Sequence, residues 1–264
     1  MFALQDSYGK PLNAEYADLR MRNEPLVEST QVKGTSDTHP LLSPNDEWAD
    51  FEIMPLRVAS ALPSQPQGSY VREAYLNGLE MAAEQDFNPY RFGVIGSSDT
   101  HNAAGSFDED NYWSKTGVRD IQPQDRGSVP LDEPGPDGEL YANPPSRFWG
   151  GSGLAGVWAE SNTRESIYAA FRRKETFSTS GPHIQVRFFG GYGLKQDLVF
   201  ASDNIAQLYR QAVPMGSDLL RNDDQPPSFF AWAARDADSG TLQRLQIVKA
   251  VSYTHLTLPT NREV

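Results

Sequence analysis

The chain has 264 residues, of which 23 are Lys or Arg and 35 are Asp or Glu, so its formal net charge is −12. This excess of acid, without a basic stripe, argues against a protein that binds nucleic-acid phosphates or an anionic membrane surface. The absence of Cys excludes disulfides, thiolate metal sites and cysteine nucleophiles, and no apolar run reaches the length of a membrane-spanning helix.

The first part of the chain alternates between strand and helix patterns. Residues 24–32 form a short apolar run with β-branched side chains that predicts a strand, and residues 35–46 are rich in turn formers. Residues 70–85 carry apolar side chains at three- and four-residue spacing after Ser69, which predicts a capped amphipathic helix. The apolar run 91–96 predicts a second, buried strand. The order strand, helix, strand is typical of a parallel sheet in an α/β protein.

Regular patterns disappear between residues 103 and 151, where prolines interrupt any element that begins. A loop of this length is usually functional or disordered. Beyond it, residues 156–159 predict a buried strand. Asn162 and Thr163 then precede a helical pattern that continues to Lys174, whose cations suit a helix C-terminus.

The last part of the chain changes to an alternating pattern typical of strands. Apolar and polar side chains alternate over residues 184–188, and further strands are expected at 229–233 and 245–248. We therefore expect two units: a first domain, residues 1–180, and a β-rich C-terminal module, residues 181–249.

Residues 250–264 look foreign to the rest of the chain. Most of this segment can be back-translated with allowed codons into the transposon-end adapter used to prepare sequencing libraries. We expect an artefact that packs against nothing and can be removed without loss of stability, with a genuine polar tail as the alternative. His255 lies in this segment and is therefore not considered as a functional residue, so the candidate histidines are His39, His101 and His183.

The most informative feature is a repeated tetrapeptide, Ser-Asp-Thr-His, at residues 36–39 and 98–101. Each copy follows a Gly-containing turn after a strand-like run. In an extended segment, residues i and i+2 point to the same side, so Asp99 and His101 can aim into one pocket at the C-terminal end of their strand. A carboxylate with an imidazole forms half of a metal site, and ligands without thiolate suit zinc, manganese or iron.

Turn chemistry is the alternative interpretation of both copies. Asp99 can serve as a turn or cap residue and His101 as a surface side chain. The position after the strand at 91–96, together with the duplication, favours metal ligands for the second copy. For the first copy, a functional role and a role in the turn are equally supported, because Pro40 and Asn45 already indicate a loop.

The other candidates are single side chains or weak motifs. Lys33 lies three residues before the first tetrapeptide and could bind an anionic substrate. Glu28 is either a pocket carboxylate or a simple strand-end residue, and His183, between Gly-Pro and a strand, reads as structural. Residues 151–156 match the Gly-x-Gly-x-x-Gly pattern but lead into an apolar strand, which argues against a dinucleotide site.

Several longer strings resemble a bacterial family catalogued as a domain of unknown function, DUF3604. They include Glu-Pro-Leu-Val-Glu (24–28), Gln-Val-Lys-Gly-Thr-Ser-Asp-Thr-His-Pro (31–40), Leu-Ser-Pro-Asn-Asp-Glu (42–47), Gly-Val-Ile-Gly-Ser-Ser-Asp-Thr-His-Asn-Ala (93–103) and Asn-Thr-Arg-Glu (162–165). That family is similar to the polymerase-and-histidinol-phosphatase (PHP) superfamily of metallohydrolases, which has a distorted β/α barrel and a multinuclear metal centre. The superfamily's final metal motif, Asp-x-His, maps onto Asp99 and His101.

The resemblance implies an α/β fold that comprises the C-terminal part of a distorted PHP-like β/α barrel followed by a β-rich extension. It also implies hydrolysis of phosphate or sulfate esters by a metal-activated water, with zinc, manganese or iron as the divalent metal and a small anionic ester as the substrate. The residues expected at the site are Asp99 and His101 as metal ligands, Lys33 and His39 for charge stabilisation or leaving-group protonation, and Glu28, Asp37 and Ser98 for substrate binding.

Two departures from the family pattern bear on these expectations. Relatives commonly carry Glu where the first tetrapeptide has Asp37, which is one methylene shorter. The superfamily's early His-x-His and Asp-His motifs are absent, so we expect a fragment truncated at both ends and a weak catalyst by itself. A non-catalytic binding or structural protein and a metal-dependent amidohydrolase or peptidase are the alternatives, and the oligomeric state and compartment stay open.

Overall fold

The computed structural model describes residues 1–57, 60–103, 122–127, 129–142, 149 and 152–251. The helices are α1 (Ala14–Asn23), α2 (Val71–Gln85), α3 (Pro123–Arg126), α4 (Arg164–Arg173), α5 (Asn204–Gln211) and a 3₁₀ helix at Gln196–Phe200. The strands are β1 (Leu26–Gln31), β2 (Gly34–Thr35), β3 (Gly93–Gly96), β4 (Leu154–Val157), β5 (Thr176–Thr179), β6 (Gln185–Tyr192), β7 (Ala212–Pro214) and β8 (Pro227–Ala234). The mixed content confirms the predicted α/β class.

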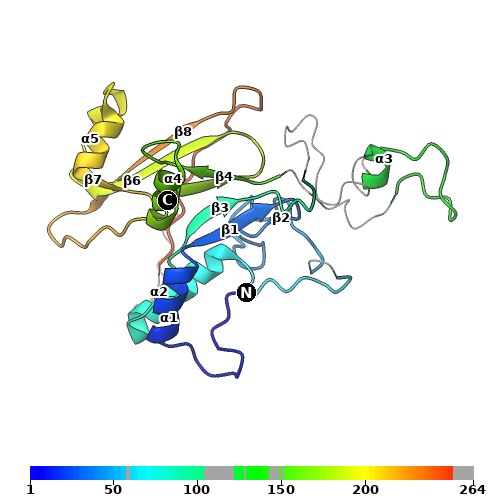
Figure 1. Ribbon diagram of the computed structural model, residues 1–264, viewed down its shortest axis with the longest axis horizontal. Helices are drawn as coiled ribbons and strands as arrows, with labels where there is room; N and C mark the ends of the chain where they lie inside the picture. The colour runs from blue at the N-terminus through cyan, green and yellow to red at the C-terminus, as the bar shows by residue number, and fades with distance from the viewer. Residues whose placement is uncertain (58–59, 104–121, 128, 143–148, 150–151, 252–264) are drawn as a thin grey trace.

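The parallel pair β1 and β3 lies at the centre of the first part of the chain (Figure 1). Leu26 lies opposite Gly93 and Thr30 opposite Gly96, with a register shift between Glu28 and Thr30. The connection between the two strands runs through α2, so the predicted strand, helix, strand order is confirmed. On its other edge β1 pairs with the short antiparallel strand β2, which gives the sheet order β2-β1-β3.

A second, two-stranded sheet of β4 and β5 lies against β3. β5 runs alongside β3 in the same direction, because a side chain at Gly93 would meet Thr176 and one at Gly96 would meet Thr179. β4 pairs with β5 in the antiparallel sense. The strands of the described residues form two three-stranded sheets and one two-stranded sheet, and no closed barrel. A PHP-like barrel is therefore not shown.

The helix α2 covers the β1–β3 pair with the apolar face that its spacing predicted. Val71, Ala74 and Met81 are buried in a core that also contains Tyr90 and Phe92. The predicted cap was wrong. The N-cap residue is Tyr70, whose side chain makes no capping bond, while the hydroxyl of Ser69 donates instead to the carbonyl oxygen of Gln65 (2.7 Å).

Several elements escaped the sequence analysis. The polar helix α1 buries only Ala17, so its sequence has little apolar periodicity. Its cap is recognisable in the structure, since Asn13 accepts the N–H of Tyr16 (2.9 Å). The short strand β5 and the helix α5 were also missed. The four-residue helix α3 begins at Pro123, in the region where prolines were expected to stop every element.

The strands β6, β7 and β8 form a three-stranded antiparallel sheet with the order β7-β6-β8, and we use the name C-terminal module for this sheet with the helices that pack against it (Figure 1). Its own core consists of Phe189, Leu198, Leu208 and Phe230. The predicted strand at 229–233 is confirmed as part of β8. The strand expected at 245–248 was wrong: these residues have no strand partner in the described structure, and the side chains of that segment are exposed.

Two sequence predictions fall on residues outside the described structure. Most of the long loop 103–151 and the tail from residue 252 onward belong to this class. Among the described helices, none has both the length and the apolar character that crossing a membrane requires.

The cap of α4 gives a first testable prediction. The Thr163 side chain accepts the N–H of Ser166 (3.3 Å), as its place before the helical pattern predicted. Thr163→Ala should lower the free energy of unfolding by about 1 kcal/mol, the usual value of an N-cap hydroxyl. Urea unfolding measures the change. Asn162→Ala, one residue earlier and also exposed, is the control, and an equal loss in both variants would contradict the capping role.

Candidate functional site

The second tetrapeptide leaves the sheet at the C-terminal end of β3. The N–H of Ser97 donates to the carbonyl oxygen of Thr30 (3.1 Å), which extends the parallel ladder by one residue. The hydroxyl of Ser97 donates to the Glu28 carboxylate. Glu28 of β1 therefore lies at the same end of the sheet as residues 98–101, where α/β proteins commonly bind ligands.

Two hydroxyl turns then shape the second tetrapeptide. The Ser98 hydroxyl accepts the N–H of Thr100 (3.2 Å), and the Thr100 hydroxyl accepts the N–H of Asn102 (3.3 Å). Asp99 has a left-handed backbone with φ 50°, a conformation that Asp tolerates better than most residues. The extended geometry assumed for this segment was therefore wrong, and a turn brings the side chains together instead.

The side chains of Asp99 and His101 nevertheless converge. Asp99 Oδ1 lies 3.6 Å from His101 Nε2, and the two side chains are 28% and 59% exposed. This separation is too long for a good hydrogen bond. It does suit two donors of one metal, since bonds of about 2.0–2.2 Å in tetrahedral geometry place donors about 3.4 Å apart.

The pair is not a complete metal centre by itself. Within the part of the chain that the structure describes, no group of three or more His, Asp or Glu side chains is arranged to hold a metal ion. Glu28 is near through Ser97 but does not complete such a group. The donors present therefore fit a divalent metal as two of the three or more ligands that such sites usually have.

The first tetrapeptide has the same sequence but a different environment. It follows β2, on the opposite edge of β1 and in the opposite direction from β3. The carbonyl oxygen of Asp37 accepts the N–H of Arg72 in the first turn of α2 (3.0 Å), and its carboxylate forms an ion pair with the same Arg72 (2.7 Å). The Nδ1 of His39 accepts the N–H of Leu41 (3.1 Å). Turn and helix-start chemistry thus accounts for the contacts of Asp37 and His39.

The charge of Arg72 is shared between two carboxylates. Asp46 lies 2.6 Å from the guanidinium, on the other side from Asp37. Partial burial lowers the pKa of Arg72, but the two carboxylates outweigh it and raise that pKa above its ordinary value. The N–H of Trp48 and the Arg72 guanidinium together hold the pKa of the Asp46 carboxyl below its usual range, against the opposing effect of burial. This ion pair ties the loop after β2 to α2.

The remaining expected residues lie in separate places. Lys33 occupies the turn between β1 and β2, and its Nζ donates to the Ser36 hydroxyl (2.6 Å). It lines a cavity of about 260 Å³ that does not include Asp99 or His101. The N–H of His183 donates to the Asp236 carboxylate (2.6 Å), which is consistent with its structural reading.

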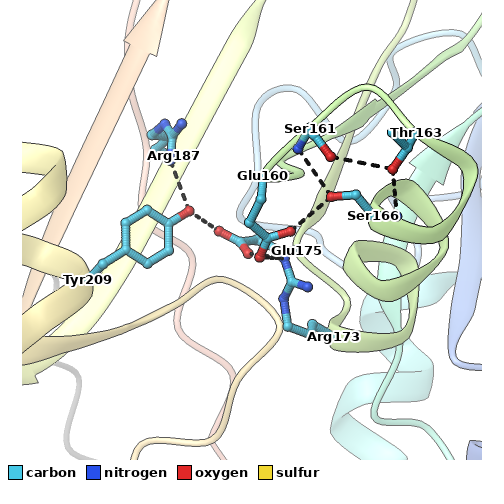
Figure 2. Close-up of polar contacts among 8 residues, drawn as sticks. All are labelled: Glu160, Ser161, Thr163, Ser166, Arg173, Glu175, Arg187 and Tyr209. Carbon is cyan, nitrogen blue, oxygen red and sulfur yellow. Dashed lines mark hydrogen bonds and ion pairs between the residues drawn. The ribbon is translucent and has the colours of Figure 1, made fainter.

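A polar cluster that the sequence did not reveal joins α4 and β5 to the C-terminal module (Figure 2). The Glu175 side chain is buried and accepts hydrogen bonds from the Tyr209 hydroxyl and from Arg173 (3.3 Å). Arg187 donates to the same Tyr209 hydroxyl (3.0 Å) and lies 3.5 Å from the ring centroid of Trp158. Burial, followed by the hydrogen bond to Glu175, raises the pKa of Tyr209.

We interpret this cluster as structural. Arg173, Arg187 and Tyr209 come from α4, β6 and α5, while Trp158 directly follows β4 and Glu175 directly precedes β5, so no local sequence spacing could have indicated the cluster. Every charged member has an opposite charge, an aromatic ring or a hydroxyl beside it. We therefore assign it to the docking of the C-terminal module and not to ligand binding.

The comparisons with known proteins concern the family alone. A family model described as "Protein of unknown function (DUF3604)" matches residues 1–255. Neither the search of curated proteins nor the search of solved structures found a match.

Proposed function

The chain belongs to the DUF3604 family of proteins of unknown function, and from that premise we propose that it is part of a metal-dependent hydrolase of phosphate or sulfate esters. The observation that supports the proposal is the convergence of Asp99 and His101, 3.6 Å apart, directly after β3. Carboxylate and imidazole donors together suit zinc, manganese or iron.

The proposed relation to a PHP-like barrel has one supporting observation. β1 and β3 are parallel neighbours, and β5 runs alongside β3 in the same direction. Three adjacent strands with this order would form an arc of a β/α barrel, with the C-terminal ends of the strands at one rim. Asp99 and His101 would lie at that rim.

The proposed roles follow from the positions of the side chains. Asp99 and His101 would hold the metal, which when bound would polarise the ester oxygen and lower the pKa of a water. Glu28 and Ser98 lie at the same end of the sheet and would contact the substrate or orient the water. Asp37 and His39 have weaker support as site residues, because Arg72 and Leu41 already engage them.

A second candidate function is ligand binding without catalysis. It is favoured by the finding that the described residues bring only two good metal donors together, with no third His, Asp or Glu in the group. In that case Asp99 would only form the turn, and His101 would be an ordinary exposed side chain. Metal binding by the purified chain, followed by an assay of metal-dependent ester hydrolysis, distinguishes the two candidates.

The duplicated tetrapeptide provides a matched control for that experiment. Asp99→Asn with His101→Gln should weaken binding of Zn²⁺ or Mn²⁺ by about a hundredfold or more, since even loss of an outer-shell partner costs about 10–100-fold. Asp37→Asn with His39→Gln makes the same chemical change in the other copy and should leave metal affinity unchanged. Isothermal titration calorimetry of the metal-free protein measures both.

Two results would count against the proposal. Equal metal affinity in the two double variants would show that Asp99 and His101 hold no metal. Tight metal binding without metal-dependent hydrolysis of aryl phosphates or aryl sulfates would favour the binding protein over the hydrolase. Thermal unfolding of each variant is the check on folding, particularly for Asp37→Asn, which breaks the ion pair with Arg72.

A further inference from the structure

We propose that the cavity beside the β1–β2 turn is a binding site for a phosphate or sulfate group, separate from the Asp99–His101 pair. The cavity has a volume of about 260 Å³ and lies between that turn and the segment that precedes α2. Ligand cavities for drug-sized molecules usually measure about 300–1,000 Å³. The cavity lies just below this range, a size that suits a small anion or a small ester.

The charge of the cavity wall is opposite to that of the chain. Lys33 and Arg57 line the cavity, and no Asp or Glu stands among its described lining residues. The whole chain has a formal charge of −12. Two cations in a hollow, within a protein that otherwise repels anions, concentrate positive potential at that place.

Hydroxyl groups complete the set of donors. Ser36, Ser64 and Tyr70 line the cavity, together with Ser69, whose hydroxyl already donates to the carbonyl oxygen of Gln65. A tetrahedral oxyanion accepts many hydrogen bonds, and bonds between ionised partners are roughly twice as strong as neutral ones. Lysine, arginine and hydroxyl donors around one small cavity therefore match phosphate or sulfate better than a neutral ligand.

The two cations are held by the local structure. The Nζ of Lys33 donates to the Ser36 hydroxyl (2.6 Å) and to the carbonyl oxygen of Thr35 (3.5 Å). The Nε of Arg57 donates to the carbonyl oxygen of Pro63 (3.2 Å), which fixes the plane of the guanidinium. The backbone N–H of Arg57 also donates to Leu62 (2.9 Å). Preorganised donors lose less entropy when a ligand binds.

Part of the wall is apolar. Met54 and Leu56 line the cavity together with the Tyr70 ring. An organic group attached to the anion can pack against this wall, so an ester should bind more tightly than the free anion. The relative affinity for an ester and for the free anion therefore shows whether the ligand is an organic ester or inorganic phosphate or sulfate.

The test is titration calorimetry of the full chain with inorganic phosphate, sulfate, phenyl phosphate and, as a negative probe, chloride. Arg57→Gln and Lys33→Gln should each weaken phosphate binding by about tenfold or more, the value of one hydrogen bond to a charged group. Lys10→Gln with Arg210→Gln removes two exposed cations elsewhere and should change phosphate affinity little. Arg57 is itself exposed, so its replacement should leave the fold intact.

The outcomes decide the proposal and the kind of ligand. Phosphate binding that is lost in the cavity variants and retained in the control supports the site. Tighter binding of phenyl phosphate than of phosphate identifies an ester ligand, and equal binding identifies the free anion. The proposal is overturned if the unaltered chain binds neither phosphate nor sulfate. It is also overturned if Arg57→Gln binds phosphate as tightly as the unaltered chain does. Because no metal enters this experiment, its result is independent of the hydrolase proposal.

Discussion

Replacing Gly96 by Ala is expected to lower the free energy of unfolding by about 1–3 kcal/mol, the usual cost of overpacking a tight core. A Cβ atom at this position would lie 2.7 Å from the carbonyl oxygen of Leu154 and 2.8 Å from its nitrogen. It would also lie 2.8 Å from the carbonyl oxygen of Thr179. These are backbone atoms of β4 and β5, which cannot move aside as a flexible side chain can, so the effect should lie toward the upper end.

The same substitution should disturb the candidate site. Gly96 ends β3 and is followed directly by Ser97, whose N–H and hydroxyl bond to β1. A backbone shift at Gly96 would therefore displace Asp99 and His101, and it should weaken the metal binding proposed for them along with stability. Urea unfolding and metal titration of the same variant measure the two effects.

Gly240→Ala is the matched control, because a Cβ there would meet no atom within 4 Å. Its stability should stay within about 0.5 kcal/mol of the unaltered chain or rise slightly, since Ala restricts the unfolded chain. If Gly96→Ala unfolds at the same urea concentration as Gly240→Ala, the close approach of β3 to β4 and β5 is not a constraint on the fold.

Glu175→Ala is expected to destabilise the chain by about 1–3 kcal/mol, because it removes the acceptor shared by two donors of a buried cluster. Glu175 is only 4% exposed, and its carboxylate joins Arg173 to the Tyr209 hydroxyl of α5 (Figure 2). Without the carboxylate, the Tyr209 hydroxyl would lose its acceptor. The C-terminal module should consequently dock less firmly on β5.

Glu160→Ala provides the comparison. Its carboxylate accepts from the same Arg173 (3.0 Å), but its side chain is 71% exposed, so solvent can replace the contact and the change should be small. A double-mutant cycle of Glu175→Ala with Tyr209→Phe should give a coupling of about 0.5–3 kcal/mol. Additive losses would show that the two side chains do not act together, and an equal loss in Glu160→Ala would remove burial as the explanation.

The elements that the sequence predicted best are those that bury an apolar face. The strands at 24–32 and 91–96 and the helix at 70–85 all have apolar residues at a spacing that only one type of element can bury. Thr163 was likewise recognisable as a cap from its position before the α4 pattern. The polar helix α1 was missed, and the apolar segment 245–248 was wrongly expected to pair, because periodicity does not tell whether a partner strand exists.

The predictions for the two tetrapeptides also had different outcomes. Asp99 and His101 were found from a repeated tetrapeptide after a strand, and the structure brings their side chains together. The identical spacing in Asp37 and His39 predicted nothing about their surroundings. Arg72, 35 residues further along the chain from Asp37, engages that carboxylate instead.

The sequence by itself therefore determined the family resemblance, the α/β class, the parallel pairing of β1 with β3 and the choice of Asp99 and His101. Only the tertiary structure decided in which copy of the tetrapeptide the Asp and His side chains converge, where Lys33 and Arg57 line one cavity, and how Glu175 contacts Tyr209 of the C-terminal module. Local spacing fixes which side of its own element a residue occupies. The partners it meets there come from elements far along the chain, and their approach depends on packing, such as the contact at Gly96 that leaves no room for a side chain.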